Sequence, residues 1–424
     1  MSEKIVIGMA GFGTVGKAVY AILQRNRDLI ESRCGKPLEI KTVVCRHTDR
    51  ARSQLPSSVT VSDNTLTISQ DPEINTVIEV MGGIEPAKTL ILKSLESGKN
   101  VVTANKALLA THGKEIFARA NKFNRCVFFE ASVAGGIPII KALREGLCAN
   151  RIRKITGILN GTCNFILSSM QQKPVSFEQA LKEAQELGYA EADPTFDIEG
   201  FDTGHKLTIL SALAFGTTLQ FKPENVCGIS SVTQTHIKMA NAMGYVVKLL
   251  ATAEIIDQSV RLSVAPTLIP KDSFLANVNG AMNAVQIESD ALGSSLYYGA
   301  GAGGEPTASA VLADICDIAQ AHRCTVNVTD TVQSLTLANK ENVKFEHFIV
   351  FETGTVFSDF KDSVEAAFKN ENIRIKQILT EQDNLALITG PCCYISIENA
   401  LKSLDRISQK EFSISKFCVD NLRN

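Results

Sequence analysis

The chain has 424 residues, more than one ordinary domain holds, so we expect two or three domains. Hydrophobic residues make up 45% and charged residues 21%, which is typical of a globular protein with ample core. The formal net charge of −2 gives no broad attraction to nucleic acid or to an anionic membrane surface, so neither is expected as a partner.

The N-terminal residues, the cysteines and the histidines indicate the cellular compartment and whether a metal site is expected. We expect no signal peptide, because the first residues lack its charged region and cleavage site, and no membrane span, because no apolar run approaches ~18 residues. Eleven cysteines include no C-x-x-C pair, which suits reduced thiols in a cytoplasm. Six histidines form no H-E-x-x-H motif, so a zinc site is not expected.

The first element is a short apolar strand at residues 5–10, followed by the glycine-rich run from Gly11 to Gly16 and an amphipathic helix. This is G-x-G-x-x-G after a strand and before a helix. Gly11 would make the tight turn, Gly13 would let the backbone approach a pyrophosphate, and Gly16 would allow close helix packing. The sequence therefore predicts a dinucleotide site; the alternative is a glycine turn that serves only packing.

The second strand, expected at residues 38–45, ends at Arg46, with Arg50 close behind. A site that prefers NAD has an acid at this strand end to accept from the ribose 2′-hydroxyl, whereas cationic side chains suit a 2′-phosphate. We therefore predict a preference for NADP(H), with NAD(H) as the alternative cofactor. A solvated loop with two ordinary arginines is the alternative reading of the same residues.

Alternating strands and helices continue with strands at 77–81 and 100–103 and a helix at 88–97. The second of these strands is followed by Lys106. Ligand groups in such folds lie at the carboxyl ends of parallel strands, so Lys106 is a candidate for the active crevice. A chance surface lysine is the alternative.

An acidic segment from Gly188 to Lys206 carries five carboxylates and then one lysine. Asp202 is expected to cap a new helix, and its spacing places it on one helix face with Lys206. A lysine held among acids and shielded from water can donate a proton, and the remaining acids can bind a substrate ammonium group. The alternative is a solvated acidic loop with a surface salt bridge.

Five motifs in order closely resemble the homoserine dehydrogenase family over roughly residues 5–325. One of the five is the acidic segment 188–206. The other four are Thr103-Ala-Asn-Lys-Ala-Leu-Leu-Ala110, Glu130-Ala-Ser-Val-Ala-Gly-Gly-Ile-Pro138, Gly157-Ile-Leu-Asn-Gly-Thr-Cys-Asn-Phe165 and Tyr298-Gly-Ala-Gly-Ala-Gly-Gly-Glu-Pro-Thr307. The resemblance implies hydride transfer between L-aspartate 4-semialdehyde and L-homoserine with NAD(P)(H), on the route to threonine, methionine and isoleucine.

The resemblance also implies roles for single residues. Lys206 matches the family's proton donor, Asp202 its carboxylate partner, and Lys106 a lysine near substrate and nicotinamide. Residues on the substrate side are Glu191, which would bind the ammonium group, and Asp197, Gly161, Thr162 and Tyr189. On the cofactor side, the resemblance implies Phe12, Thr14, Val15, Gly188, Gly303 and Lys106. These join Gly11, Gly13, Gly16 and Arg46, which the glycine motif and the end of the second strand predict. A sodium-type monovalent cation site is implied at Glu130 with the backbone carbonyls of Val133, Gly135 and Ile137; a plain turn is the alternative.

We therefore expect an α/β protein of three parts. A Rossmann dinucleotide-binding domain spans 1–130 and is completed by a return helix at about 305–325. An α+β catalytic and dimerisation domain spans 131–325. The pattern after residue 343 reads βαββαβ and predicts a ferredoxin-like, ACT-like domain at 343–424. Its first turn, residues 352–357, lacks the proline and the aspartate usual in ACT domains. Two roles stay open for the domain: it binds an effector, or it serves only dimerisation.

Two other functions remain open at this point. An aldehyde dehydrogenase would need a cysteine nucleophile beside a base, and none of the cysteines lies in such a motif. A non-catalytic sensor of an amino acid or of NADPH would have no need for Lys106, Glu191, Asp202 and Lys206 together. We expect a homodimer or a homotetramer, by analogy with other proteins of this architecture.

Overall fold

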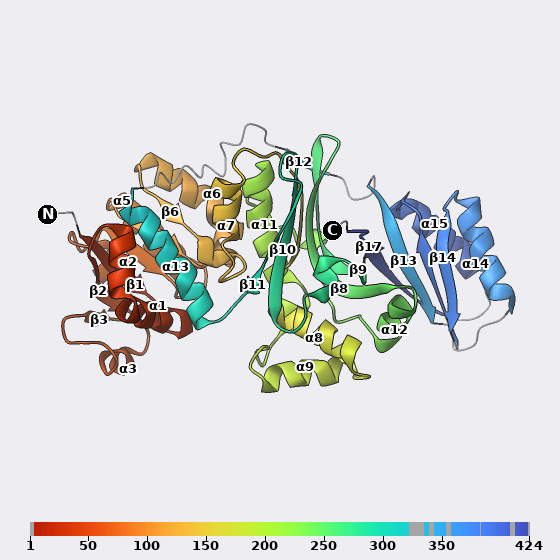
Figure 1. The fold of residues 1–424 in the computed structure, drawn as a ribbon, viewed down its shortest axis with the longest axis horizontal. Coiled ribbons are helices and arrows are strands. Elements are labelled where there is room, and N and C mark those ends of the chain that lie inside the picture. Colours follow the sequence, from red (N-terminus) through yellow and green to blue (C-terminus); the bar gives the residue numbers. More distant parts are fainter. Residues whose placement is uncertain are drawn as a thin grey trace.

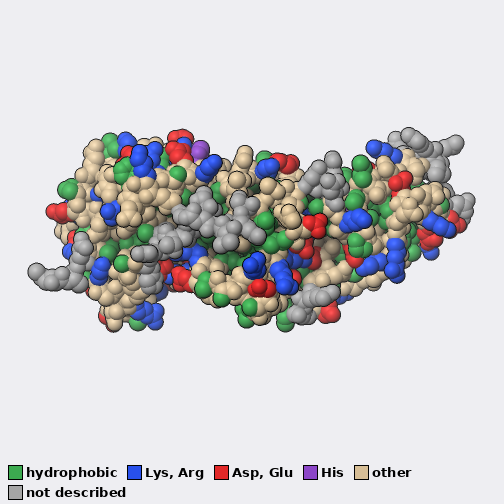
Figure 2. Space-filling model, turned by 90° about the horizontal axis from the view of Figure 1, so that it is seen from above, with side chains coloured by type: hydrophobic (Ala, Val, Ile, Leu, Met, Phe, Trp, Pro, Cys, Tyr) green, Lys and Arg blue, Asp and Glu red, His purple; other side chains and the backbone are tan. Residues whose placement is uncertain are grey.

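The computed structural model describes residues 4–321, 335–338, 343–352, 358–381, 383–407 and 412–422. The molecule is elongated, with a parallel sheet at one end and a smaller sheet-and-helix unit at the other (Figure 1). Basic and acidic side chains are both spread over the face seen in Figure 2, in keeping with the small net charge. Within the described residues, no helix is long and apolar enough to cross a membrane.

The N-terminal sheet is parallel throughout, with strand order β3-β2-β1-β4-β5-β6. The order reverses between β1 and β4, so their carboxyl ends flank a crevice of the kind that holds ligands in open α/β sheets. The strands are β1 (Ile5–Ala10), β2 (Leu38–Val44), β3 (Thr60–Ser62), β4 (Thr76–Glu79), β5 (Asn100–Thr103) and β6 (Val127–Phe128).

Helices cover both faces of this sheet because neighbouring strand residues point to opposite sides. Val77 and Val101 pack in one core with α5 and α6, whereas Ile78 and Val102 pack in another with α1, α2 and α13. The predicted return helix is therefore part of the N-terminal unit. The helices are α1 (Thr14–Arg25), α2 (Arg27–Cys34), α3 (Thr48–Arg52), α4 (Leu66–Ser69), α5 (Glu85–Glu96), α6 (Lys106–Lys122) and α13 (Gly304–Ala319).

The middle of the chain forms an antiparallel run of strands in the order β11-β10-β7-β8-β9, with α8 and α11 packed against it. The strands are β7 (Ile152–Ile158), β8 (Tyr245–Ile256), β9 (Ser259–Pro270), β10 (Met282–Ser289) and β11 (Ser294–Ala300). The helices are α7 (Ile139–Lys141), α8 (Gly161–Gln172), α9 (Phe177–Glu186), α10 (Thr195–Ile198), α11 (Phe201–Phe215) and α12 (Gln234–Ala242).

The C-terminal unit extends the same sheet, because β17 pairs in parallel with β9. Its order β17-β13-β15-β14, with one helix in each crossover, matches the ferredoxin-like βαββαβ plan. The unit has its own hydrophobic core. Whether it is an ACT domain that binds an effector stays a prediction. Its main elements are β13 (Lys344–Glu352), α14 (Ser358–Asn370), β14 (Ile375–Glu381), β15 (Asn384–Thr389), α15 (Tyr394–Ile407) and β17 (Ser413–Val419).

The sequence placed most element boundaries within about three residues. The return helix ends at Ala319, earlier than the expected residue 325, and residues 322–325 lie outside the described part of the chain. Residues 353–357 of the unusual first turn of the C-terminal unit also lie outside it. Two short strands were not anticipated, β12 (Thr336–Leu337) on β9 and β16 (Cys392–Cys393) on β13.

Candidate active site

The glycine-rich loop joins β1 to α1, and its three glycines meet different surroundings. Gly11 has φ +107°, and a Cβ there would lie 2.4 Å from the carbonyl oxygen of Val80. A Cβ on Gly16 would lie 2.1 Å from the carbonyl oxygen of Gly11. A Cβ on Gly13 would meet no atom within 4 Å. Two glycines therefore let backbones touch, while the third faces open space at the N-terminus of α1, where a phosphate group is favoured.

That open space is a cavity of about 690 Å³ at the crevice between β1 and β4. The glycine loop and the loop after β4 form two of its walls, and the third is the end of β2, with Arg46 and Arg50. Asp63 and Lys17 also line the cavity and were not anticipated from the sequence. Of the predicted cofactor residues, Gly11, Phe12, Gly13, Thr14 and Arg46 line it. Val15, Gly16, Lys106, Gly188 and Gly303 belong to the described chain but lie outside this lining.

The return segment reaches the glycine loop from the other end of the chain. Gly303 has φ +117° and precedes α13, and a Cβ on Gly304 would lie 3.1 Å from Cγ2 of Thr14. Arg25 at the end of α1 forms an ion pair with Glu305, with Nη1 and Oε1 3.0 Å apart. The start of α13 is thus packed against the loop at the base of the cavity.

The ends of β4 and β5 are tied together by buried polar contacts. Thr103 Oγ1 donates to Glu79 Oε2 at 2.6 Å, and the side chain of Asn105 donates to the carbonyl oxygen of Gly83 at 2.7 Å. Asn105 also caps α6 by accepting from the backbone N–H of Leu108. These contacts fix the first residue of α6, which is Lys106.

Two lysines meet one buried carboxylate at this place. Lys106 Nζ lies 2.7 Å from Asp202 Oδ1, and Lys206 Nζ lies 2.6 Å from Asp202 Oδ2. Lys206 also donates to the carbonyl oxygen of Leu159 at 2.6 Å. Asp202 is only 2% exposed and Lys206 only 7%. The surface salt bridge considered from the sequence is therefore excluded, and the i,i+4 geometry on α11 is confirmed.

The expected helix cap at Asp202 is wrong. Gly200, with φ +81°, is the N-cap residue of α11, and Asp202 lies in the first turn with its oxygens directed to the two lysines. Asn160, which the sequence reading missed, donates from Nδ2 to Asp202 Oδ2 at 2.9 Å and to Asp197 Oδ1 at 2.8 Å. Its only sequence signal is its place directly before the Gly161–Thr162 turn.

Burial and charge act in opposite directions on the pKa values of these groups. Burial lowers the pKa of Lys206, Asp202 partly offsets this effect, and nearby Lys106 adds to it. Burial also lowers the pKa of Lys106, but the attraction of Asp202 and the other nearby acids is larger, so the pKa of Lys106 is raised. Burial disfavours the carboxylate of Asp202, yet the two lysines hold its pKa well below its usual range. Of the two lysines, Lys206 is the one whose environment makes it the stronger acid.

The residues predicted to lie on the substrate side make the following contacts. Thr162 Oγ1 donates to the carbonyl oxygen of Tyr189 at 2.5 Å, and a Cβ on Gly161 would lie 2.6 Å from the carbonyl oxygen of Ala281. Glu191 is exposed, and its charge adds to those that raise the pKa of Lys106. Gly188, at φ +76°, ends α9 with open space at its Cβ position. Thr162 and Tyr189 are thus in contact, and Glu191, which interacts with Lys106, is exposed to solvent.

The predicted cation segment is buried, but the Glu130 carboxylate has other partners. Its two oxygens accept from the backbone N–H groups of Ile140 and Lys141 at the start of α7, at 2.9 and 2.8 Å. Gly135, at φ +50°, packs against the carbonyl oxygen of Gly301. In the described part of the chain, no group of three or more His, Cys, Asp or Glu side chains is arranged to hold a metal ion. A cation here would rest on backbone carbonyls.

Comparison with known proteins agrees with this architecture. The family models "Homoserine dehydrogenase, NAD binding domain" and "Homoserine dehydrogenase" match residues 11–130 and 138–316. The chain is similar to the homoserine dehydrogenase of Neisseria gonorrhoeae, with 42% identity over 100% of both chains. It is 50% identical to that of Pseudomonas aeruginosa over 75% of this chain and 73% of that protein.

Solved structures give the same result. The crystal structure of a homoserine dehydrogenase from Thiobacillus denitrificans has a TM-score of 0.90 and 41% identity, covering 99% of this chain and 98% of that one. A hyperthermophilic archaeal homoserine dehydrogenase mutant in complex with NADPH has a TM-score of 0.64 and 26% identity, covering 76% and 99%. The chain therefore belongs to the homoserine dehydrogenase family of NAD(P)-dependent oxidoreductases.

Proposed function

We propose that the protein interconverts L-homoserine and L-aspartate 4-semialdehyde with NADP(H) and uses Lys206 as general acid and base. The observation that carries this proposal is the chain of charges Lys106–Asp202–Lys206, in which Asp202 and Lys206 are buried. Lys106 begins α6 directly after β5 of the parallel sheet. When bound, NADP(H) would supply or accept the hydride. The chain's own residues then have to orient the small zwitterion, move one proton and stabilise negative charge on oxygen.

Lys206 suits the proton transfer because its ammonium group has three N–H donors and a fixed direction. Asp202 Oδ2 and the carbonyl oxygen of Leu159 are its two hydrogen-bond partners among the described residues, which leaves one N–H for a substrate oxygen. A lowered pKa makes an ammonium group a stronger acid toward the alkoxide that forms when an aldehyde is reduced. In the direction of homoserine oxidation the neutral amine accepts the hydroxyl proton.

Asp202 and Lys106 complete this arrangement. Asp202 holds Lys206 in one orientation and compensates its buried charge. Lys106 adds positive charge beside the developing oxyanion, where low dielectric strengthens electrostatic interactions. Asn160 donates from one amide nitrogen to both Asp197 and Asp202, so it bridges the two acids.

The substrate's ammonium group would be bound by Glu191, with Asp197 as a second acid and Gly161, Thr162 and Tyr189 forming the wall. Glu191 is accessible to a ligand, and it lies close enough to Lys106 for their charges to interact. Fixing the ammonium group at Glu191 would orient the aldehyde carbon, and orientation can contribute on the order of 7 kcal/mol to catalysis.

The choice of NADP(H) over NAD(H) rests on Arg46 and Arg50. Both line the cavity at the end of β2, where a 2′-phosphate would lie against the guanidinium groups. Gly13 leaves room for the pyrophosphate, so the residues present fit the cofactor. The archaeal neighbour in complex with NADPH is in keeping with this choice. Lys106, Gly188 and Gly303 do not line this cavity and would contact the nicotinamide half of the cofactor.

A monovalent cation of the sodium type is a weaker part of the proposal. Because the Glu130 carboxylate accepts from two backbone N–H groups, the ion would be held by the backbone carbonyls of Glu130, Val133, Gly135 and Ile137. Sodium chloride should then raise the Tm more than choline chloride at equal ionic strength. Equal effects of the two salts would remove the cation from the account.

We also infer the setting of the enzyme. It would act in the cytoplasm in the synthesis of threonine, methionine and isoleucine, as a homodimer or homotetramer. Light scattering of the purified protein measures its mass in solution, and a monomeric mass would contradict the assembly.

The direct test of the reaction is incubation with L-homoserine and NADP⁺, following the absorbance of reduced cofactor. The proposal expects reduction of NADP⁺ that depends on homoserine. A matched substrate, 4-hydroxybutanoate, lacks the ammonium group and should react far more slowly because Glu191 and Asp197 have nothing to bind. Absence of reduction with homoserine would contradict the proposal, and equal rates with both substrates would exclude the role of the two acids.

A further inference from the structure

Two thiols that are 282 residues apart in the sequence meet where α2 and α13 pack together. Cys34 is the last residue of α2, and Cys316 lies near the end of α13. Their sulfur atoms are 2.9 Å apart, and both residues are reduced cysteines. This pair lies in the N-terminal unit and takes no part in the proposed reaction.

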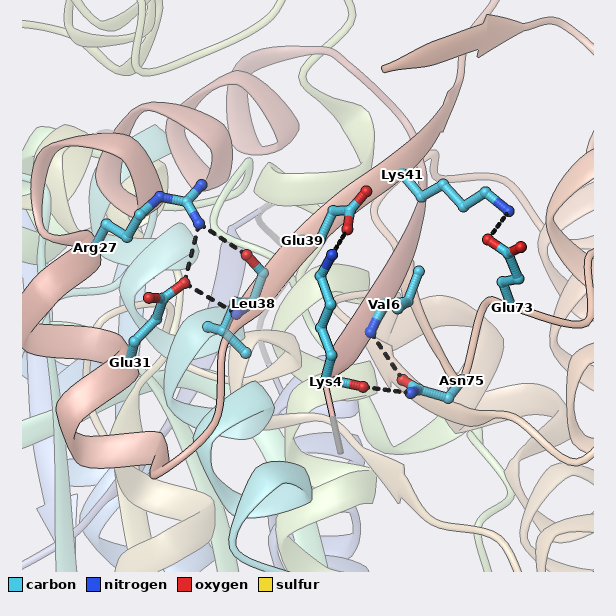
Figure 3. Close-up of polar contacts among 9 residues, drawn as sticks. All are labelled: Lys4, Val6, Arg27, Glu31, Leu38, Glu39, Lys41, Glu73 and Asn75. Carbon is cyan, nitrogen blue, oxygen red and sulfur yellow. Dashed lines mark hydrogen bonds and ion pairs between the residues drawn. The ribbon is translucent and has the colours of Figure 1, made fainter. Parts of the chain in front are cut away.

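The backbones that carry the two thiols are already held in place. Gln320, one turn after Cys316, donates from Nε2 to the carbonyl oxygen of Arg33 at 2.7 Å. At the other side of α2, Glu31 Oε1 accepts from the backbone N–H of Leu38 and from Arg27, which also donates to the carbonyl oxygen of Leu38 (Figure 3). These contacts hold the end of α2 and the end of α13 beside each other, and they keep the two sulfur atoms within contact distance.

The two thiols differ in exposure and in charge environment. Cys34 is 3% exposed, whereas Cys316 is partly exposed. Cys34 donates its S–H to Cys316, which lowers the pKa of the Cys316 thiol, and Lys141 and Arg33 lower it further against the opposing effect of burial. The same contact, together with burial, raises the pKa of Cys34. Cys316 is therefore the attacking thiol and Cys34 the resolving one, since thiolates are the nucleophiles in disulfide exchange.

We propose that Cys34 and Cys316 form a modification site, a dithiol that a low-molecular-weight disulfide such as glutathione disulfide converts to an intramolecular disulfide. The Cys316 thiolate attacks one sulfur of glutathione disulfide, whose S–S bond breaks and releases one glutathione thiolate. Cys34 then attacks the Cys316 sulfur of the mixed disulfide and displaces the second glutathione. Two protons pass from the cysteines to the two leaving thiolates. The protein is oxidised by two electrons and glutathione disulfide is reduced to two thiols.

The bond would join the return helix covalently to the nucleotide-binding unit. The other end of α13 packs on Thr14 of the glycine loop, and its acids Asp314 and Asp317 bind the backbone of Glu130 and the side chain of Lys141. A cross-link that closes a loop of this length restricts the unfolded chain. The oxidised protein should therefore unfold at a Tm several degrees above that of the reduced protein.

The test uses the full chain incubated with glutathione disulfide, with reduced glutathione as the reference. Mass spectrometry of the intact protein, followed by non-reducing peptide mapping, should show loss of two hydrogens and a Cys34–Cys316 linkage. Cys34→Ser should stop at one glutathione on Cys316, whereas Cys316→Ser should leave Cys34 unmodified because it is buried. Cys148→Ser, at an exposed cysteine, is the matched control and should still form the linkage.

The result that would overturn the proposal needs no variant. If the wild-type protein keeps both thiols while exposed Cys148 reacts, or if the loss of two hydrogens maps to other cysteines, the pair is not a modification site. Glutathione retained on Cys34 in Cys316→Ser would overturn the assigned order of attack.

Discussion

Lys106 Nζ lies 2.7 Å from Asp202 Oδ1, and this contact joins the parallel sheet to the helix that carries Lys206. Lys106 begins α6 directly after β5, whereas Asp202 lies in the first turn of α11 in the middle unit. Asp202 is therefore shared between two lysines from two parts of the molecule. Its charge is the one on which the protonation of both depends.

Replacement of Asp202 by Asn should move the alkaline limb of aldehyde reduction to lower pH. The negative charge of Asp202 favours protonated Lys206, so its removal lowers the pKa of Lys206 further and the acid is lost earlier as pH rises. The kcat for aspartate semialdehyde reduction as a function of pH measures this shift. Asp193→Asn, an exposed acid in the same segment, should leave the limb in place. An unmoved limb in Asp202→Asn would exclude Lys206 as the titrating acid.

Two alanine substitutions in the glycine loop should affect different properties, one the Tm and the other the affinity for NADPH. At Gly16 a Cβ would lie 2.1 Å from the carbonyl oxygen of Gly11, so Gly16→Ala should lower the Tm clearly. At Gly13 the Cβ position is open, so Gly13→Ala should fold normally but bind NADPH more weakly, because the methyl group occupies the path of the pyrophosphate. Thermal unfolding and fluorescence titration with NADPH separate the two effects. Equal Tm losses in both variants would contradict the assignment of Gly13 to the ligand.

Charge reversal at Arg46 should reduce the preference for NADP(H). A charged hydrogen bond contributes about 1.5–3 kcal/mol, so Arg46→Glu should lower the ratio of kcat/KM for NADP⁺ to that for NAD⁺ roughly tenfold or more. Arg52→Glu, at the end of α3 and outside the cavity lining, is the control. If Arg46→Glu leaves the ratio as it is in the wild type, the predicted NADP preference is wrong.

Acid should destabilise the C-terminal unit through His347. Burial lowers the pKa of this histidine to about 4, whereas in the unfolded chain it would be 6.5. The contribution of neutral His347 to the free energy of unfolding is fully present above pH 6.5 and is lost as the pH falls toward 4. The reason is that the unfolded chain binds a proton at this histidine at a higher pH than the folded unit does. The loss between pH 7 and 4.5 is about 2 kcal/mol. Urea midpoints at both pH values should therefore differ less in His347→Phe than in the wild type.

A control fixes the interpretation of that experiment. His112 lies on α6 in the N-terminal unit, and His112→Gln should keep the pH dependence of the wild type. An unchanged difference between pH 7 and 4.5 in His347→Phe would show that other groups govern the acid lability of the C-terminal unit.

The sequence predicted the structure correctly where a feature depends only on residues that are close together along the chain. The strand, glycine loop and helix at residues 5–25 follow from local periodicity, and the Asp202–Lys206 pair follows from helical spacing. The order βαββαβ of the C-terminal unit was also predicted from the sequence, and the structure has this order with the short β16 added.

Contacts made by distant segments could not be read in the same way. Asn160 lies 42 residues from Asp202 along the chain, and the carbonyl oxygen of Leu159 has no side-chain signature at all. The prediction that Asp202 caps α11 was wrong because α11 begins with a left-handed residue, a conformation that glycine adopts easily. Gly200 is therefore the N-cap, and the carboxylate of Asp202 binds the lysines instead. The hydrogen bonds that the Glu130 carboxylate accepts from backbone N–H groups of α7 also have no side-chain signature, and the cation expected at this segment stays a prediction.

The most direct test of the central claim is the kcat of Lys206→Ala for aspartate semialdehyde reduction, measured beside its Kd for NADPH. The account predicts a kcat lowered roughly 10²- to 10⁴-fold with the Kd for NADPH unchanged, as expected for loss of a general acid. Lys206→Arg should be similarly impaired, because a guanidinium keeps the charge but scarcely releases a proton. Lys88→Ala, at a surface ion pair, is the control. Ordinary turnover in Lys206→Ala would contradict the account.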